Sequence, residues 1–207
     1  MQTPKTPRLR QRGSALVEFV LGIALFWVPL FFGVLVIGFG LVRAVQVTQV
    51  CRDAGHMYAY GIDFTLPTYQ TLLASLAQGY TLTSSGNAVV VLSTVTYISS
   101  TDCQAGGYPP TCANVNQMVI TRQIVVGNSS IHGSSFGTPP AGDMGTDGNV
   151  TAAGYLNDPL CQASNFSNVI PLTDGQYAYV SEMWVNSPDV NWWSVLGATA
   201  LSARSIF

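Results

Sequence analysis

The sequence predicts an α+β protein in which a long N-terminal helix precedes an antiparallel sheet of about four strands. Residues 19–42 are apolar without interruption, which is typical of a helix that is apolar on every side. The second half instead has four segments rich in Val, Ile, Thr and aromatic residues, which is typical of strands. Helix first and sheet second is an α+β order.

Charged residues are scarce and unevenly placed along the chain. They make up 9% of the 207 residues, against about 25% in a typical soluble domain. Half of the basic residues lie near the start, at Lys5, Arg8, Arg10 and Arg12. This distribution predicts a membrane protein with an exported domain. It argues against a nucleic-acid partner, because binding phosphates needs a clustered basic surface.

The apolar run 19–42 has the length of a transmembrane helix. Its 24 residues would span roughly 36 Å, more than a hydrocarbon core of about 30 Å. A cleaved secretory signal is the alternative, but its apolar region has only about 7–15 residues and ends at a small-residue site. Pro29 and the glycines within the run predict a local kink or unwinding. The basic leader 1–13 predicts a cytoplasmic N-terminus and an extracytoplasmic C-terminal part.

Beyond the span, the pattern predicts that the helix continues, so that it covers residues 14–62. Apolar residues recur at helical spacing, whereas polar residues form the opposite stripe and Gly61 ends the helix. The apolar stripe, which we expect to pack on the chain's own sheet, consists of Val47, Val50, Ala54 and Met57.

Residues 63–207 are predicted to form a single α+β domain. Pro67 suits the first turn of a second helix over 67–79. The four predicted strands cover 88–99, 118–126, 177–185 and 199–207. A stretch rich in Gly, Ser, Asn, Asp and Pro, residues 127–160, is predicted to be an extended loop that is either a recognition surface or mobile.

Glu18 is a carboxylate at the head of the apolar run, directly before Phe19. A carboxylate close to hydrocarbon costs a few kcal/mol unless it is paired or near the interface. In the simplest interpretation, Glu18 reaches the cytoplasmic headgroups. A second interpretation comes from its context, in which basic residues precede Gly13, Ser14 and the Glu18-Phe19 pair.

This context resembles the prepilin cleavage site of the TadE-like minor pilins and pseudopilins of tight-adherence (Flp-type) type IV pilus systems. Two further segments are similar to that family: Cys51-Arg-Asp-Ala-Gly-His-Met-Tyr-Ala-Tyr-Gly61 after the apolar run, and the ending Ala200-Leu-Ser-Ala-Arg-Ser205. Most type IV pilins have Phe or Met after the glycine, whereas this chain has Ser14. The N-terminal resemblance covers residues 10–61.

The resemblance implies a pilin-like fold and a structural function. A prepilin peptidase would cut between Gly13 and Ser14, and Glu18 would then face the new amine of Ser14 on a neighbouring subunit. Such a pair sets axial register more than it adds stability. The implied location is the bacterial inner membrane, and the implied partners are the peptidase, other pilin subunits and the pilus-assembly platform.

Four cysteines, Cys51, Cys103, Cys112 and Cys161, permit three pairings. Cys103 and Cys112 bracket a turn-rich loop, so outside the cytoplasm their spacing favours a disulfide, which leaves Cys51–Cys161 as the second pair. The alternative is four reduced, buried thiols. Because no Cys-x-x-Cys occurs and both histidines are isolated, we expect no metal site.

No recognised catalytic motif is present, so we expect neither an enzyme nor a cofactor. Residues 143–149 have a faint calcium-loop pattern that lacks its later acidic ligands. We interpret Asp174, Glu182 and Asp189 as solvated acids and assign Trp184, Trp192 and Trp193 to the core or a subunit contact. Two alternatives to the pilin remain: an uncleaved single-pass membrane protein with a binding or adhesive ectodomain, and a membrane-anchored enzyme.

Overall fold

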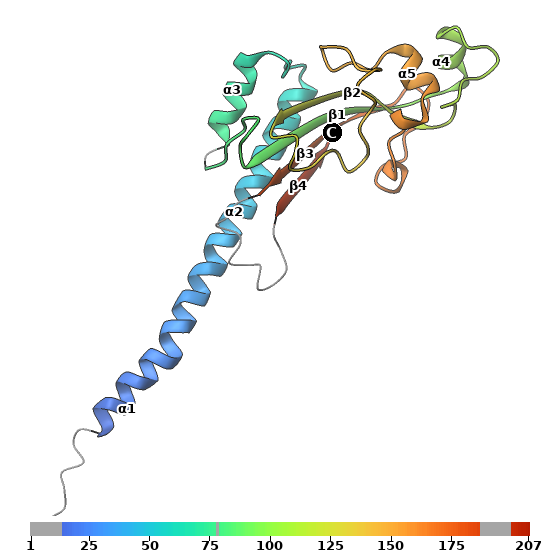
Figure 1. Cartoon of the computed structure of the whole chain (residues 1–207). Helices are drawn as coiled ribbons and strands as arrows, with labels where there is room; N and C mark the ends of the chain where they lie inside the picture. Colours follow the sequence, from blue (N-terminus) through green and yellow to red (C-terminus); the bar gives the residue numbers. More distant parts are fainter. Residues whose placement is uncertain (1–13, 78, 187–199) are drawn as a thin grey trace, which may run out of the picture. The chain divides into compact units, whose positions relative to one another are not determined.

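The computed structural model describes residues 14–77, 79–186 and 200–207. The chain forms two compact units, Met1–Val42 and Arg43–Phe207. In chain order the elements are α1 (Ser14–Gly22), the π-helical η1 (Ile23–Trp27), α2 (Val28–Ala59), α3 (Pro67–Leu76), β1 (Ala88–Tyr97), α4 (Ser100–Ala105), β2 (Met118–Gly127), α5 (Ala152–Asn157), the 3₁₀ helices η2 (Pro159–Cys161) and η3 (Phe166–Asn168), β3 (Tyr177–Val185) and β4 (Leu201–Ile206) (Figure 1). This order confirms the α+β prediction.

The N-terminal helical segment is continuous from α1 through η1 into α2. Its single change of geometry lies just before Pro29. There the Val28 N–H donates to the Ile23 carbonyl, five residues back rather than four. Pro29 has no N–H to offer the carbonyl of Leu25, and a π-turn is one way in which helices accommodate such a gap. The local unwinding predicted from Pro29 therefore takes the form of one π-turn.

The sheet has the strand order β2-β1-β3-β4, and every neighbouring pair is antiparallel. The β1–β2 register shifts between Thr94 and Val95, where β2 carries the extra residue Thr121 as a β-bulge. The observed bounds agree with the predicted strands to within about two residues; the expected start of the last strand at Thr199 lies outside the described residues. The second helix ends at Leu76, three residues before the predicted Gly79.

The second half of α2 covers one face of the sheet together with α3. Val47, Val50 and Ala54 recur at helical spacing and are buried against that face. The strand residues that meet them alternate along each strand, because successive side chains point to opposite faces. They are Val90, Leu92, Ile124, Val126, Met183 and Val185.

In the described part of the chain, the other face of the sheet is covered mainly by irregular segments and the 3₁₀ helix η3. Phe136, only 3% exposed, lies in a second apolar cluster with Phe166, Leu172 and strand residues such as Val180. Ile131 packs in a third cluster beside Trp184. Residues 131–136 of the predicted extended loop 127–160 therefore belong to a packed layer, and the loop also contains a helix, α5, that the sequence pattern did not predict.

Candidate functional site

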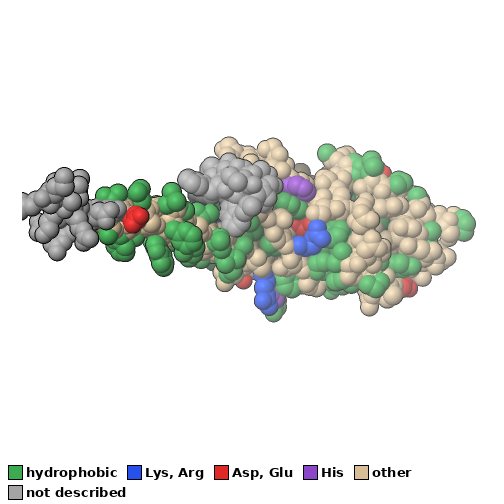
Figure 2. Space-filling view, turned by 90° about the horizontal axis from the view of Figure 1, so that it is seen from below, with side chains coloured by type: hydrophobic (Ala, Val, Ile, Leu, Met, Phe, Trp, Pro, Cys, Tyr) green, Lys and Arg blue, Asp and Glu red, His purple; other side chains and the backbone are tan. Residues whose placement is uncertain are grey.

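The surface of the N-terminal helix is the most unusual feature of the molecule. Within Ala15–Ala59, an 18-residue window has a mean hydropathy of 2.7, and none of it is buried within the protein. On the face drawn in Figure 2, hydrophobic side chains gather along the uncovered part of this helix. Water-exposed apolar patches of this size mark membrane or protein contacts. The helix is long and apolar enough to cross a membrane.

Glu18 and Phe19 lie on α1 within this apolar surface. Phe19 is 68% exposed, and Glu18 is also exposed. Within residues 14–77, 79–186 and 200–207, neither of the ion pairs involves Glu18. Ser14 is the first residue of α1, whereas Gly13 lies outside the described residues, so the processing prediction cannot be located on the structure.

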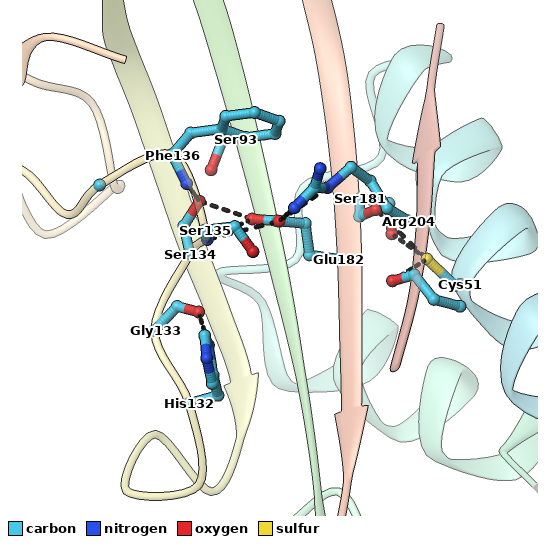
Figure 3. Close-up of polar contacts among 12 residues, drawn as sticks. Cys51, Ser93, His132, Gly133, Ser134, Ser135, Phe136, Ser181, Glu182 and Arg204 are labelled. Carbon is cyan, nitrogen blue, oxygen red and sulfur yellow. Dashed lines mark hydrogen bonds and ion pairs between the residues drawn. The ribbon is translucent and has the colours of Figure 1, made fainter. Parts of the chain in front are cut away.

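The second half of α2 is joined to the sheet by polar contacts as well as by packing. The Cys51 thiol is fully buried and lies 3.2 Å from the Ser181 carbonyl oxygen on β3 and 3.4 Å from the Ala203 carbonyl oxygen on β4 (Figure 3). At the end of the helix, one residue before Ala59, the Tyr58 hydroxyl lies 2.8 Å from Thr94 Oγ1. These contacts fix the helix across β1, β3 and β4.

Glu182 is the most deeply buried carboxylate in the described part of the chain, and its interpretation as a solvated acid is wrong. It is 1% exposed. Arg204, directly across from it on β4, donates through Nε at 3.0 Å and places Nη2 2.9 Å from the same Oε1 atom (Figure 3). Ser134 Oγ and the Ser135 N–H donate to Oε2. These bonds offset the free-energy cost of burying the carboxylate, which would be high without partners.

The arginine of this pair also contacts the loop layer. The Arg204 guanidinium lies 4.3 Å from the centroid of the Phe136 ring, which is a cation–π contact. Two strands and the loop 133–137 therefore meet at Glu182. Its donors come from two distant parts of the chain, the loop at Ser134–Ser135 and strand β4, so the arrangement favours a structural anchor rather than acid–base chemistry.

Trp184 packs on the same face, beside this anchor. Its ring stacks on the ring of His132, with centroids 4.3 Å apart and an interplanar angle of 12°. Trp184 is 8% exposed, which confirms its assignment to the core. The other tryptophans considered with it, Trp192 and Trp193, lie outside the described residues, as does Asp189.

The cysteines confirm one predicted disulfide and contradict the other. Cys103 and Cys112 are bonded, with Cα atoms 5.3 Å apart. Cys51 and Cys161 are free, buried thiols. Cys51 lies under β3 and β4, whereas the chain at Cys161–Gln162 borders the far edge of β2 through the Val119–Gln162 bridge. Several strand spacings of about 4.8 Å separate these places, more than a disulfide can span.

Both free thiols are kept un-ionised by their surroundings. Burial raises the pKa of Cys51, with a smaller contribution from the negative charge of Glu182. Burial, followed by the charges of Asp143 and Asp158, raises the pKa of Cys161 to about 11. Because the thiolate is the reactive form, these groups behave as small apolar side chains at neutral pH.

The acidic stretch with the faint calcium-loop pattern folds as a turn. The Asp147 carboxylate accepts bonds from the Asn149 backbone N–H, at 3.1 Å, and from the Asn149 side chain. These bonds are the main reason why the pKa of Asp147 is lowered. In the described part of the chain, no group of three or more His, Cys, Asp or Glu side chains could hold a metal ion.

A groove of about 720 Å³ lies in the described part of the second unit, on the helix-covered face of the sheet. It begins where α2 ends, so strand residues that would otherwise lie under the helix are open to water. Tyr58 and Gly61 border one side, and α4 and α5 border the other. No motif in the sequence pointed to it, because its lining residues come from six separate segments.

The comparisons with known proteins leave the family open. No family model matches the chain, and no curated protein and no solved structure matches it significantly. The resemblance to TadE-like pilins therefore continues to depend on the residues of the N-terminal segment and of the C-terminal strand.

Proposed function

We propose that this chain is a structural subunit, a minor pilin or pseudopilin of a tight-adherence type IV pilus. In this proposal the apolar helix holds the precursor in the bacterial inner membrane, with the N-terminus cytoplasmic and the second unit extracytoplasmic. A prepilin peptidase cuts between Gly13 and Ser14. Packing of the released helix against other subunits then carries the domain into, or beneath, a filament.

The observation that carries this proposal is the division of one helix between two environments. Up to Val42 its large apolar side chains are exposed, whereas beyond Arg43 its apolar stripe is part of the domain core. An exposed apolar helix must be covered by lipid or by other helices. A subunit that moves from a bilayer into a helical bundle needs a surface suited to both.

Glu18 gives the proposed bundle a means of alignment. It is the one charged residue in the stretch 14–42. A carboxylate buried among packed apolar helices is costly unless a cation meets it, so subunits that bring a cation to Glu18 are favoured over other axial positions. The amine that cleavage would create at Ser14 is such a cation. The buried pair would therefore select the register of assembly.

The test is the N-terminal sequence of the protein extracted from membranes that contain a prepilin peptidase. We expect the chain to start at Ser14, having lost 13 of its 207 residues. Gly13→Leu should block this processing. Gly22→Ala is the matched control, since a Cβ at Gly22 meets nothing within 4 Å, and it should be processed normally.

Two outcomes would contradict the proposal. A chain that starts at Met1 in the presence of an active peptidase would favour the uncleaved anchor with a binding ectodomain. Cleavage of the Gly13→Leu variant at the same position and rate would show that the assigned site is wrong. Glu18→Gln should be processed but should assemble less, which separates processing from alignment.

A further inference from the structure

The groove beyond the end of α2 has a chemical character that differs from the rest of the same sheet face. Under the helix, the strands present aliphatic side chains such as Val90, Leu92 and Ile124. Past the helix, the same strands present hydroxyl groups from Thr94, Thr96 and Thr121. Because a hydroxyl buried without a partner is costly, this change suits a surface that contacts water or a polar ligand.

Aromatic rings accompany the hydroxyl groups. Tyr58, Tyr155 and Tyr179 all line the groove, and the rings of Tyr58 and Tyr179 meet edge to face with centroids 5.4 Å apart. Tyr58 is 3% exposed, so the ring surface that a ligand can reach belongs to the half-buried Tyr155 and Tyr179. A tyrosine offers an apolar face and a hydroxyl at its edge. The side chains are also held in place: Tyr58 bonds Thr94, and Thr96 Oγ1 lies 3.2 Å from Thr121 Oγ1. A pre-organised surface loses less entropy when it binds a ligand.

The groove carries little free charge. Of its lining residues, only Arg122 and Asp102 are charged. Arg122 Nη2 lies 2.8 Å from Asp63 Oδ1, and its Nε donates to the Asp147 carbonyl oxygen. The Asp102 carboxylate accepts bonds from the N–H and the hydroxyl of Ser99, both at 2.8 Å. Both charges therefore already have partners, so strong binding of an ion is disfavoured.

The backbone around the groove argues against a peptide ligand. β1 runs along its floor and is hydrogen-bonded on both sides, to β2 and to β3. The floor therefore has no open strand edge to which an extended peptide could add. A peptide enclosed there would need other partners for its own N–H and C=O groups.

We propose that this groove binds a short neutral oligosaccharide. Sugar hydroxyls both donate and accept hydrogen bonds, as the threonine and tyrosine hydroxyls do, and the C–H faces of sugar rings are apolar enough to pack on tyrosine rings. The volume of about 720 Å³ lies within the usual range of ligand sites, about 300–1,000 Å³. This inference does not depend on processing at Gly13, and the two can fail separately.

The test uses the full chain reconstituted in lipid nanodiscs, applied to a printed array of neutral and anionic glycans. Maltotriose and chitotriose are titrated in solution alongside the array. We expect at least one neutral glycan to bind. The absence of any neutral binder on the array, or binding confined to anionic glycans, would overturn the proposal.

Two neighbouring positions on α5 supply a matched pair of variants. Ala152 lines the groove, whereas Ala153, also exposed, does not. Ala152→Trp should fill the groove and weaken binding at least tenfold, and Ala153→Trp should leave it unchanged. Equal glycan binding by the two variants would show that this groove is not the binding site.

A second variant keeps the proposal testable if Ala152→Trp fails to fold. Thr96→Val nearly keeps the side-chain volume and removes one hydroxyl, so it should weaken binding about threefold, while loss of the contact with Thr121 Oγ1 lowers the thermal midpoint only slightly. Thr173→Val, exposed and outside the groove, is its control and should bind as the wild type does. If Thr96→Val and Thr173→Val bound identically, the hydroxyl surface would have no part in recognition.

Discussion

The two halves of α2 belong to one helix but lie in different environments. From Val28 to Val42 apolar residues occupy every side, and large side chains such as Phe31 and Phe39 are 62% and 68% exposed. From Arg43 to Ala59 the buried residues return at helical spacing, and Ala54 is fully buried. A periodic stripe is thus matched by the chain's own sheet, whereas a surface without a period needs a partner outside the chain.

The largest expected effect comes from placing a charge in the second half. Ala54→Asp would bury an unpaired carboxylate between α2 and the sheet, so we expect it to lower the free energy of unfolding of the second unit by more than about 4 kcal/mol. Val45→Asp is the control, because Val45 is 55% exposed on the same helix. Urea unfolding followed by circular dichroism in nanodiscs measures both, and similar stabilities would contradict the helix–sheet packing.

The next effect concerns the other face of the sheet. Glu182→Ala would leave Arg204, Ser134 and the Ser135 N–H without their acceptor. We expect a loss of about 3 kcal/mol, at the low end for a broken buried pair, because the Arg204 side chain is 37% exposed and can be hydrated. Asp174→Asn, at an exposed acid, should change the same urea midpoint little. A stable Glu182→Ala variant would mean that the loop layer does not depend on this carboxylate.

A smaller loss of stability is expected on removing the disulfide between Cys103, on α4, and Cys112. Closing the short loop between Cys103 and Cys112 should stabilise the folded state by about 2–3 kcal/mol. The double variant Cys103→Ser and Cys112→Ser should lose this amount, and adding a reductant to the wild type should reproduce the loss.

In the unreduced native protein, neither Cys51 nor Cys161 should react with iodoacetamide at pH 8. Labelling of either thiol before unfolding would contradict its burial.

The smallest effect is expected at the half-exposed pair Arg122–Asp63, which joins β2 to the turn after α2. Hydrogen bonds from Thr65, followed by the Arg122 charge, lower the pKa of Asp63. A lowered pKa stabilises the fold above the unfolded value of about 3.9, and this contribution disappears as the pH falls through the folded value. Arg122→Met should therefore lose at most about 1 kcal/mol at pH 7, and the gap to the wild type should close below about pH 4. A gap that widened on acidification would contradict this pairing.

The regular elements could be predicted because their causes are local. An uninterrupted apolar run, a helical stripe and β-branched segments each leave a pattern within a few residues. The short helices α4 and α5 are not predicted, although the capping box of α4, in which Ser99 and Asp102 bond each other's backbone, is visible in the sequence. With only six residues each, they lack a clear apolar period.

The sites could be predicted less well because their causes are not local. Glu182 and Arg204 face each other across β3 and β4, and only the strand register brings them together. Cys51 and Cys161 were paired by elimination, without knowledge of the strand order that separates them. The groove depends on where α2 ends relative to the strands, which no single segment encodes.

The most direct test of the account is to express the intact chain without detergent and to measure how it partitions between the membrane and the soluble fraction. The wild type should stay in the membrane after carbonate extraction, and Val34→Asp, which places a charge in the exposed first half, should lower the membrane-inserted fraction because it costs about 2.5–3.5 kcal/mol at the centre of a span. Ala54→Asp should remain in the membrane although its second unit is unfolded. Recovery of the wild type as a soluble protein, or an unchanged inserted fraction for Val34→Asp, would contradict the division of the helix on which the account depends.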